Sequence, residues 1–363
     1  MRLFQNSGLY PAYVPRLRQL SHKCIKFSEH LQVFLQDRYG ACHFLQPVLN
    51  GDPTAFFTNA DDEVLQHSWA RENGLGNAAT LADILLAQIE EHRTDVFYNL
   101  DPMRYASAFI RRLPGCVKES IAWRAAPSPR ADFGAYASVI CNFPSILESY
   151  RKRGWNAAYF APAHDPTMDS YAQNNERPID VLFVGGYSRH HKRRAVVLEQ
   201  VAALRHRHNV RFHLDRSRLT QLAESPFGQL LPLSNHRRPL DIRVVTAEPI
   251  FGRDLYAAFS RAKIVLNGAV DMAGEDRGNM RCFEAMGCGA LMVSDEGRYP
   301  TGMVAGETML TYSDEHQASK IIEATLADSD ACARLAANGH RAMQTGYSKA
   351  LQWQAFQDLV GSL

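Results

Sequence analysis

The chain has 363 residues, 46% of them hydrophobic and 21% charged, which favours a globular protein of two domains. Its formal net charge is only +2, so no global field attracts nucleic acid and any polyanion must bind locally. The seven cysteines form no C-x-x-C pair, which argues against a disulfide framework or a zinc site. No apolar run reaches membrane-spanning length, so we expect a cytoplasmic protein, with peripheral membrane contact left open.

The first part of the chain alternates short apolar runs with helical patterns. Residues 2–6 predict a strand, 27–35 a helix, and 81–92 a second helix followed at once by a strand. Residues 117–166 then predict strand, loop, strand, helix and strand. Strands that alternate with long helices indicate a parallel sheet covered on both faces. We assign residues 1–165 to a first Rossmann-like domain.

Residues 166–178 are polar and rich in turn formers, which predicts a linker. The pattern then restarts with "IDVLFVGG", a strand buried on both faces. A helix follows, then strands at 210–214, 241–246, 263–268 and 290–295, and helices to the end. We assign residues 179–345 to a second Rossmann-like domain and 346–363 to a C-terminal helix. Two such domains predict a cleft between the carboxyl ends of their strands.

The stretch "EDRGNMRCFEAMGCGALMVSDE" (275–296) contains the main candidate site. Asn279 predicts a helix N-cap, and the helix runs from about Met280 to Gly287. Arg281 and Glu284 lie three residues apart on it, which on its own indicates an exposed ion pair of little energetic value. The helix begins just past a strand, however, where free N–H groups and an arginine favour a phosphate. Glu284 can then accept hydrogen bonds from hydroxyls such as those of a ribose.

A second candidate follows the strand that opens the second domain. Gly185 and Gly186 end this strand, and the basic run "RHHKRR" comes next. The run is neither a dinucleotide fingerprint nor a P-loop. A solvated basic helix start is the alternative interpretation, but cations are unfavourable at a helix N-terminus unless an anion lies among them. We therefore predict phosphate contacts from Arg189 and Arg193, and next from Lys192.

The C-terminal half, from "IDVLFVGG" to about Tyr347, resembles the nucleotide-sugar-binding domain of GT-B glycosyltransferases of the group-1 type. The likeness is carried by "RGNMRCFEAMGCGALMVSDEG" and the succession from Met303 to Met343, and it favours the spore maturation protein-like branch. The resemblance implies two Rossmann-like doubly wound domains that face each other across a cleft. It also implies that the first domain binds the acceptor and that the C-terminal helix packs back on it, with a dimer contact as the alternative.

Retaining members of this group have two glutamates separated by seven residues. Glu284 matches the second, which binds the ribose of the donor, and the first falls on Asp276, with Glu275 as an alternative contact to the sugar. The resemblance also implies that Asn279, Met280 and Arg281 lie by the diphosphate, with Gly185–Gly186 beneath it. It favours a retaining reaction without a resident cofactor.

The first domain offers weaker candidates for the acceptor side. Asp101 ends a strand and is a candidate general base if the reaction inverts configuration, although strand-end aspartates often cap turns. Trp123 is a candidate for stacking on a sugar, against the more common role in a core. His164 lies where the chain crosses between domains. Asn6–Gly8 follow the first strand and are candidates to line the cleft.

These observations predict an enzyme that transfers a sugar from a nucleoside diphosphate of the UDP or GDP type. The acceptor is left open among a glycan, a lipid-linked sugar, a protein and a small molecule. No metal is expected, because the one D-x-D, Asp328 to Asp330, lies between two predicted helices and is typical of a capping turn. The alternatives are a same-fold nucleotide-sugar epimerase and a non-catalytic nucleotide-sugar-binding module.

Overall fold

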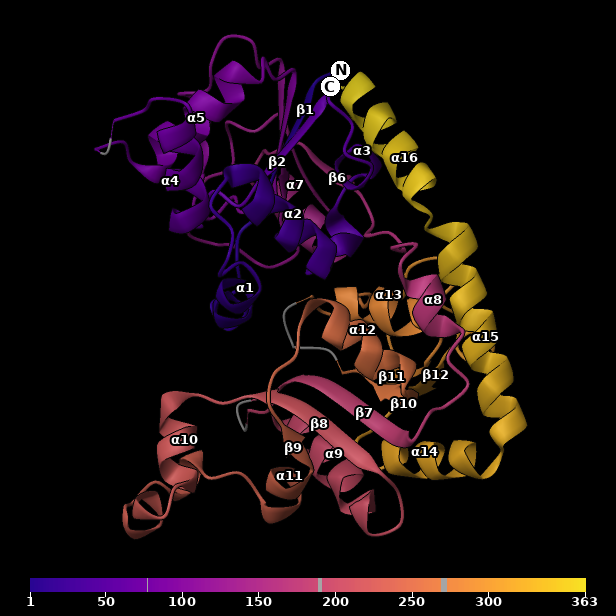
Figure 1. The fold of residues 1–363 in the computed structure, drawn as a ribbon. Coiled ribbons are helices and arrows are strands. Elements are labelled where there is room, and N and C mark those ends of the chain that lie inside the picture. The colour runs from indigo at the N-terminus through magenta and orange to yellow at the C-terminus, as the bar shows by residue number, and fades with distance from the viewer. Residues whose placement is uncertain (77, 189–190, 269–272) are drawn as a thin grey trace. The chain divides into compact units, whose positions relative to one another are not determined.

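The structure is a computed structural model that describes residues 1–76, 78–188, 191–268 and 273–363. Its contacts divide the chain into two compact units. Unit 1 consists of Met1–Ala163 and Tyr347–Leu363, and unit 2 consists of His164–Gly346. Each unit contains a six-stranded sheet in which all described pairings are parallel, with helices packed against it (Figure 1).

The sheet of unit 1 has the strand order β2-β1-β3-β4-β5-β6. Three of its four inner strands are buried along their whole length, as near-continuous apolar runs in parallel sheets require. Phe4 packs against Phe97 in the core, with 5.8 Å between ring centroids. The strands are β1 (Leu3–Asn6), β2 (Ala55–Thr58), β3 (Val96–Asn99), β4 (Glu119–Trp123), β5 (Ser138–Cys141) and β6 (Ala157–Tyr159).

The helices of unit 1 come from both ends of the chain. The last helix, α16, is held on this unit by the buried Lys349, whose Nζ donates to the carbonyls of Ala41 and Phe44, each at 2.7 Å. Phe356 of the same helix packs on Tyr98, with 5.1 Å between ring centroids. The helices are α1 (Val14–Leu20), α2 (Phe27–Asp37), α3 (Gln46–Leu49), α4 (Glu63–Glu72), α5 (Leu81–Glu91), α6 (Ser107–Ile110), α7 (Pro144–Arg151) and α16 (Lys349–Gly361).

The sheet of unit 2 has the order β12-β11-β10-β7-β8-β9, so the chain reverses direction across the sheet between β7 and β10. Its strands are β7 (Ile179–Gly186), β8 (Val210–Asp215), β9 (Thr246–Ala247), β10 (Ala262–Leu266), β11 (Leu291–Asp295) and β12 (Leu310–Tyr312). Its helices are α8 (Met168–Ala172), α9 (Lys192–Ala203), α10 (Arg218–Glu224), α11 (Leu240–Val245), α12 (Gly252–Ser260), α13 (Met280–Gly287), α14 (Gln317–Ala327) and α15 (Ser329–Gly346).

Most predicted elements are confirmed, but the expected strand at 241–246 is wrong. This segment forms helix α11, and only Thr246 enters the sheet, in the two-residue strand β9. Ile242 and Val245 are buried, whereas Leu240 and Val244 are exposed. The apolar residues of this segment therefore lie on two different faces of a helix. A short stretch with three apolar residues in six does not distinguish a strand from a helix.

The segment 166–178, which we expected to be a linker, belongs to unit 2 and contains helix α8. Met168 of this helix is fully buried. Arg177 holds the end of the segment against the sheet, because its guanidinium donates to the carbonyls of Ala262 at 2.9 Å and Cys288 at 3.3 Å. Strands β2 and β12 were not predicted, since both are short.

Candidate functional site

Helix α13 starts at the carboxyl edge of the unit 2 sheet, and Asn279 precedes it with an extended backbone. The predicted side-chain cap is wrong, because the Asn279 side chain makes no capping hydrogen bond to the helix. Its Nδ2 instead donates to Oδ1 of Asn267, at 3.2 Å, just past the end of β10. Asn267 in turn donates to Oγ of Ser294 in β11, also at 3.2 Å. The helix start is thus tied to two strand ends while no side chain caps its first turn.

Arg281 and Glu284 form an ion pair within the first turns of α13, with 2.5 Å between Nη1 and Oε2. The alternative of an exposed surface pair is wrong, because the Glu284 side chain is only 2% exposed. Burial raises the pKa of the Glu284 carboxyl, and the neighbouring Arg281 opposes that rise. A buried pair loses hydration and contributes little net stability, so stability alone is a poor reason for its presence. The Arg281 side chain, at 26% exposed, remains accessible from outside.

Asp276 is buried in the loop before α13, and its carboxylate has a protein partner. Nη2 of Arg298 lies 2.8 Å from its Oδ1. Arg277, the next residue, forms a second ion pair with Asp295 at 2.7 Å. These two pairs hold the loop to the end of β11 and to the segment that follows it, which explains much of the charge in the motif. Glu275, the alternative contact, is exposed.

Gly185 and Gly186 end β7, and the structure brings Arg194 rather than Arg193 to this turn. A Cβ on Gly185 would lie 2.8 Å from Nη2 of Arg194, so the absence of a side chain leaves room for the guanidinium. Arg194 also lies over the ring of Phe183, 5.1 Å from its centroid. Burial lowers the pKa of Arg194, and its Nε is buried without a hydrogen-bond partner among the described residues. Sequence reasoning missed this residue within the basic run.

The other basic candidates lie differently. Arg193 is exposed and turns toward the loop after β12, where its Nη2 donates to the carbonyl of Ser313 at 3.3 Å. Lys192, the first residue of α9, is exposed as well. Arg189 lies outside the described residues. The structure therefore favours Arg194 over Arg193 as the side chain aimed at the carboxyl edge.

His164 lies at the opposite end of α13 from Arg281. Its side chain is only 3% exposed, and its Nε2 is 2.8 Å from Oδ1 of Asp169. A Cβ on Gly287, the last residue of α13, would lie 3.0 Å from Nδ1 of His164. Burial lowers the pKa of this histidine, and Asp169 opposes that change. Since α13 is about 12 Å long by helix geometry, unit 2 does not bring His164 together with the helix start.

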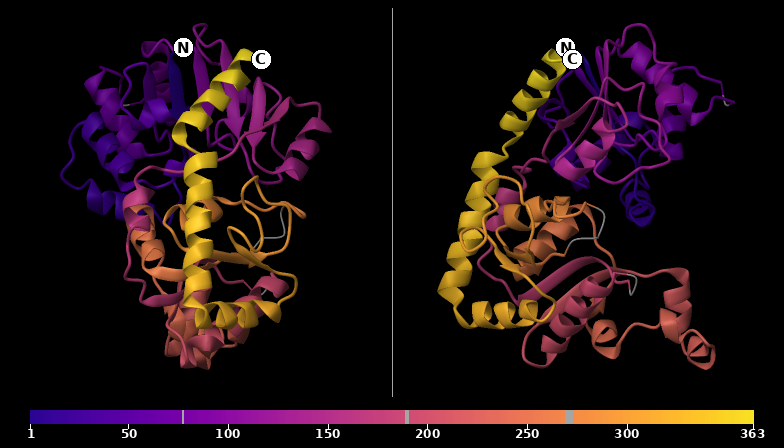
Figure 2. Two further views of the ribbon diagram at one scale, coloured as in Figure 1. Left: turned by 90° about the vertical axis from the view of Figure 1, so that its right-hand side faces the viewer. Right: turned by 180° about the vertical axis from the view of Figure 1, so that it is seen from behind.

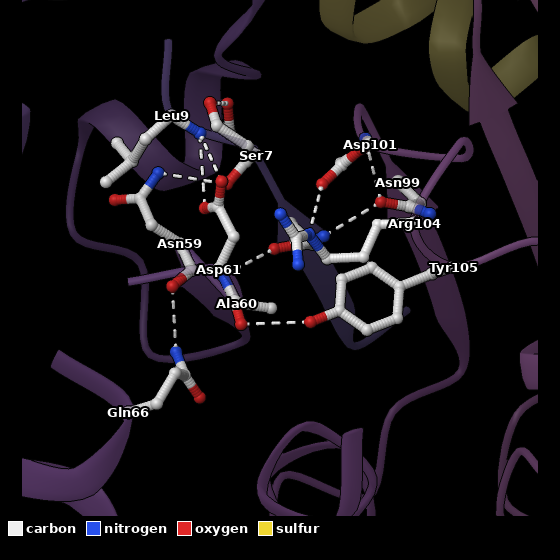
Figure 3. A network of polar contacts seen from close by, with 12 residues as sticks. Ser7, Leu9, Asn59, Ala60, Asp61, Gln66, Asn99, Asp101, Arg104 and Tyr105 are labelled. Carbon is white, nitrogen blue, oxygen red and sulfur yellow. Dashed lines mark hydrogen bonds and ion pairs between the residues drawn. The ribbon is translucent and has the colours of Figure 1, made fainter. Parts of the chain in front are cut away.

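The carboxyl edge of the unit 1 sheet is built from amides and hydroxyls (Figure 3). Nδ2 of Asn6 donates to Oδ1 of Asn99 at 2.8 Å, which joins the ends of β1 and β3. Nδ2 of Asn99 donates to Oη of Tyr136 at 2.6 Å, and the Asp101 N–H donates to the same Oδ1 of Asn99 at 2.9 Å. Oδ1 of Asn6 accepts from the N–H of Ala60 at 3.0 Å. Asn6 and Asn99 are buried and hold the loops of this edge in place.

Two carboxylates, Asp101 and Asp61, meet at this edge (Figure 3). Asp101 accepts from Nε of Arg104 at 3.3 Å, and a Cβ on Gly8 would lie 3.1 Å from its Cγ. Asp61 accepts from the N–H of Leu9 at 2.9 Å. Burial, with a contribution from Asp101, raises the pKa of Asp61 from 3.8 to about 6. A carboxyl poised in this way suits proton transfer better than an ordinary aspartate does.

Asp61 was missed because strand β2 was missed. The signal was present in "AFFTNADD" (55–62), an apolar run that ends in polar residues, as "YNLD" does after β3. Trp123, by contrast, is buried, and its ring packs on those of His43 at 4.5 Å and Phe160 at 6.3 Å. The predicted stacking on a sugar is therefore wrong for Trp123, and its core alternative is confirmed.

Several further findings delimit the site. Among the described residues, no group of three His, Cys, Asp or Glu side chains is arranged to hold a metal ion. Asp328 caps α15 by accepting from the N–H of Ala331 at 2.9 Å, so the D-x-D is a capping turn as predicted. In the same described ranges, no helix is both long and apolar enough to cross a membrane.

A cavity of about 570 Å³ lies in unit 2 near Lys263 and Gly289, which precede or begin β10 and β11 at the amino edge of the sheet. The candidate site lies at the other edge. The cations around the cavity are already engaged, since Arg177 donates to main-chain carbonyls and Lys263 pairs with Asp180 at 2.7 Å. The cavity is therefore separate from the groups described above.

Comparisons with known proteins found one family match and several similar structures. Residues 193–358 match the model of a family described as glycosyl transferase-like, and no curated protein matches the sequence. Anabaena HepE in complex with UDP and glucose is similar in structure, with a TM-score of 0.58, 13% identity and 100% of both chains covered. Sucrose-phosphate synthase from Thermosynechococcus elongatus has a TM-score of 0.51, 14% identity and 99% of both chains covered.

A third similar structure is a mutant of TarM from S. aureus in complex with Fondaparinux, alpha-GlcNAc-glycerol and UDP. Its TM-score is 0.54 at 10% identity, over 77% of this chain and 59% of that one. These likenesses establish the GT-B fold, in which both sheets are parallel and flanked by helices. The family match over residues 193–358 agrees with this fold, since it is to a family described as glycosyl transferase-like.

Proposed function

We propose that the protein transfers a sugar from a nucleoside diphosphate donor, of the UDP or GDP type, to an acceptor hydroxyl. The diphosphate would lie at the carboxyl edge of the unit 2 sheet, against the start of α13. Glu284 would accept from the ribose hydroxyls, and Asp276 or Glu275 would contact the sugar. Two complexes of HepE contain UDP-glucose or UDP with glucose, which makes UDP-glucose the first donor to test.

One observation carries this proposal: two positively charged groups of this edge lack partners within the described part of the protein. Nε of Arg194 is buried without a partner among the described residues, although arginine binds phosphate through just such groups. The first turn of α13 has no side-chain cap, and its N–H groups attract an anion. A diphosphate between them would satisfy both.

The chemistry follows from where negative charge develops. As the bond between the anomeric carbon and the diphosphate breaks, charge accumulates on the leaving phosphate oxygens. The α13 amides, Arg281 and Arg194 would stabilise that charge, so we propose a reaction that requires no metal ion. The new bond forms between the acceptor oxygen and the anomeric carbon, and the acceptor proton passes to the departing diphosphate. We propose retention of configuration from the seven-residue spacing of Asp276 and Glu284.

Binding of the nucleotide tests the site directly. We expect Arg194→Gln to weaken binding of UDP or GDP by about 10- to 100-fold, because a charge-assisted hydrogen bond to phosphate is lost. Arg193→Gln is the matched control, since its side chain points toward Ser313. Calorimetric titration of UDP, GDP, ADP and CMP into both variants and the wild type measures this. Equal losses in the two variants would contradict the assignment.

Turnover separates the proposed enzyme from its two rivals. Incubation with UDP-glucose should release UDP, slowly with water and faster with an accepted sugar, and EDTA should not stop it. An epimerase would instead yield an isomeric nucleotide sugar, and a binding module would bind UDP without any conversion. The anomeric configuration of the product, read by proton NMR, tests retention. The likeness to the spore maturation protein-like branch stays a prediction.

A further inference from the structure

Exposed apolar side chains are concentrated in one short segment of unit 2. Of the seventeen large apolar side chains that the described part of the chain exposes, seven lie between Leu219 and Val244. Phe227 and Leu230 are the most exposed of all, at 81% and 86%. Single exposed apolar residues are ordinary, but a contiguous group of them marks a binding surface.

The exposed side chains recur at helical spacing in three successive short elements. In each element, two apolar residues three or four positions apart project from the same face. Inward-facing positions are occupied by other residues, such as Ala223 in α10 and Ile242 in α11, both fully buried. The exposed pairs are Leu219 and Leu222 in α10, Phe227 and Leu230 in the 3₁₀ helix η3 (Phe227–Leu230), and Leu240 and Val244 in α11.

The segment is braced so that these side chains stay outside. Gly228 approaches the carbonyl of Leu222 so closely that a Cβ would overlap it. Arg237 ties the two elements together, because its Nε donates to the carbonyl of Ala223 at 3.1 Å and its Nη2 to that of Gly228 at 3.0 Å. The exposure of Phe227 and Leu230 is thus a consequence of specific packing.

Positive charge accompanies the apolar surface. Residues 216–245 contain five arginines and two acids, so the segment is +3 whereas the whole chain is +2. Both acids are already paired, Glu224 with Arg238 at 2.7 Å and Asp241 with Arg205 at 2.8 Å. Arg218, at the start of α10, is exposed. Arg216 pairs with Glu248 just beyond the segment, and Arg238 is buried. The surface therefore offers apolar side chains with the exposed Arg218 beside them, within a segment of net positive charge.

We propose that the segment from Arg216 to Val245, the apolar arm, docks on an anionic membrane surface. Apolar side chains beside arginines are what an interfacial element needs, since the former enter the acyl boundary and the latter contact lipid phosphates. Helix α10 extends beyond the sheet of unit 2 in Figure 1 and in the right-hand view of Figure 2, whereas α11 lies beside α9. A protrusion of this kind suits insertion into a headgroup layer.

The arm also lies on a functional edge. It begins directly after β8, whose last residue, Asp215, pairs with Gly186 at the end of β7. Membrane docking would therefore hold the carboxyl edge of the unit 2 sheet near the lipid surface. This inference does not depend on sugar transfer, because its test requires no nucleotide.

Flotation with vesicles of phosphatidylcholine, with and without phosphatidylglycerol, tests the proposal. We expect the wild type to bind the phosphatidylglycerol vesicles more strongly, and high salt to reduce binding. The double variant Phe227→Ser, Leu230→Ser should weaken partitioning into the vesicles by at least about tenfold. Arg218→Ser should weaken partitioning by about fivefold, and only with the vesicles that contain phosphatidylglycerol. Ile25→Ser, at a side chain 79% exposed in unit 1, is the matched control.

Because the substituted side chains are exposed, the melting temperature should not change, which excludes loss of folding as the cause. The proposal is overturned if the wild type ignores anionic vesicles or if the double variant binds them equally well. A second outcome also overturns it. In that outcome light scattering shows a dimeric wild type and a monomeric double variant, and neither protein binds the vesicles.

Discussion

The carboxyl edges of the two sheets share one arrangement, in which a glycine leaves room for a charged side chain, but the charges are opposite. In unit 2, Gly185 makes room for the guanidinium of Arg194, and α13 begins without a side-chain cap. In unit 1, Gly8 makes room for the carboxylate of Asp101, and Asp61 lies close enough to interact with it. One edge suits a diphosphate, and the other suits a group that donates hydrogen bonds or protons, such as a hydroxyl. Under the proposed function, the cationic edge would serve the donor and the acidic edge the acceptor.

The largest effect should come from breaking the buried pair on the cationic edge. We expect Arg281→Ala to abolish nucleotide binding and to lower the free energy of unfolding by about 3 kcal/mol, because it leaves the Glu284 carboxylate buried without its partner. Adding Glu284→Gln should restore much of that stability but no nucleotide binding. Urea denaturation and calorimetric titration measure the two properties separately.

The pH dependence distinguishes this explanation from a general packing defect. Burial raises the pKa of Glu284, so the folded state holds the proton more tightly than the unfolded state does. The cost in Arg281→Ala should therefore be largest near neutral pH and should shrink as the pH falls toward the ordinary range of a glutamate. Equal stability of the single and double variants at neutral pH would contradict the buried-charge explanation.

A smaller effect is expected from filling the two glycine spaces. In Gly185→Ala the new Cβ would lie 2.8 Å from Nη2 of Arg194, and in Gly8→Ala it would lie 3.1 Å from Cγ of Asp101. We expect the first to weaken UDP or GDP binding by about tenfold, since the guanidinium must shift away from the phosphate. The second should leave nucleotide affinity unchanged and lower the rate of transfer.

The contrast between the two glycine variants is the control, because both add one methyl group at a strand end. Thermal melting of each variant shows whether folding is affected. If Gly8→Ala lost nucleotide affinity as well, the division of labour between the two edges would be wrong.

The two edges also differ in how far the sequence predicted them. The four inner strands of unit 2 (β7, β8, β10 and β11) were predicted because buried apolar runs such as 179–186 can be recognised in sequence, and the α13 motif supplied a local pattern. The choice of Arg194 over Arg193 was not predictable, since it depends on the direction in which consecutive helix residues point. The burial of Glu284 likewise follows from what packs against α13, which no local spacing records.

In unit 1 the sequence predicted one of the two carboxylates at the acidic edge. Asp101 was found because β3 follows a clear helix, whereas Asp61 was missed with the four-residue strand β2. The strand at 241–246 was wrong for a related reason. Its apolar residues divide between a buried face and the exposed face of the apolar arm, so composition indicated a buried strand where the chain forms a helix.

The smallest expected effect concerns the titration of Asp61. The raised pKa of this carboxyl distinguishes the acidic edge from an ordinary surface, where an aspartate would titrate near its usual value. Its pKa is raised from 3.8 to about 6, so this group contributes stability at low pH that is lost as the pH rises through about 6. We expect Asp61→Asn to remove that loss, so that the variant gains about 1–2 kcal/mol relative to the wild type across this window. Asp101→Asn should instead shift the window to lower pH, because the repulsion from Asp101 is part of its cause. Urea denaturation from pH 4 to pH 7 measures both shifts, and a window unmoved in Asp101→Asn would show that the two carboxylates do not act together.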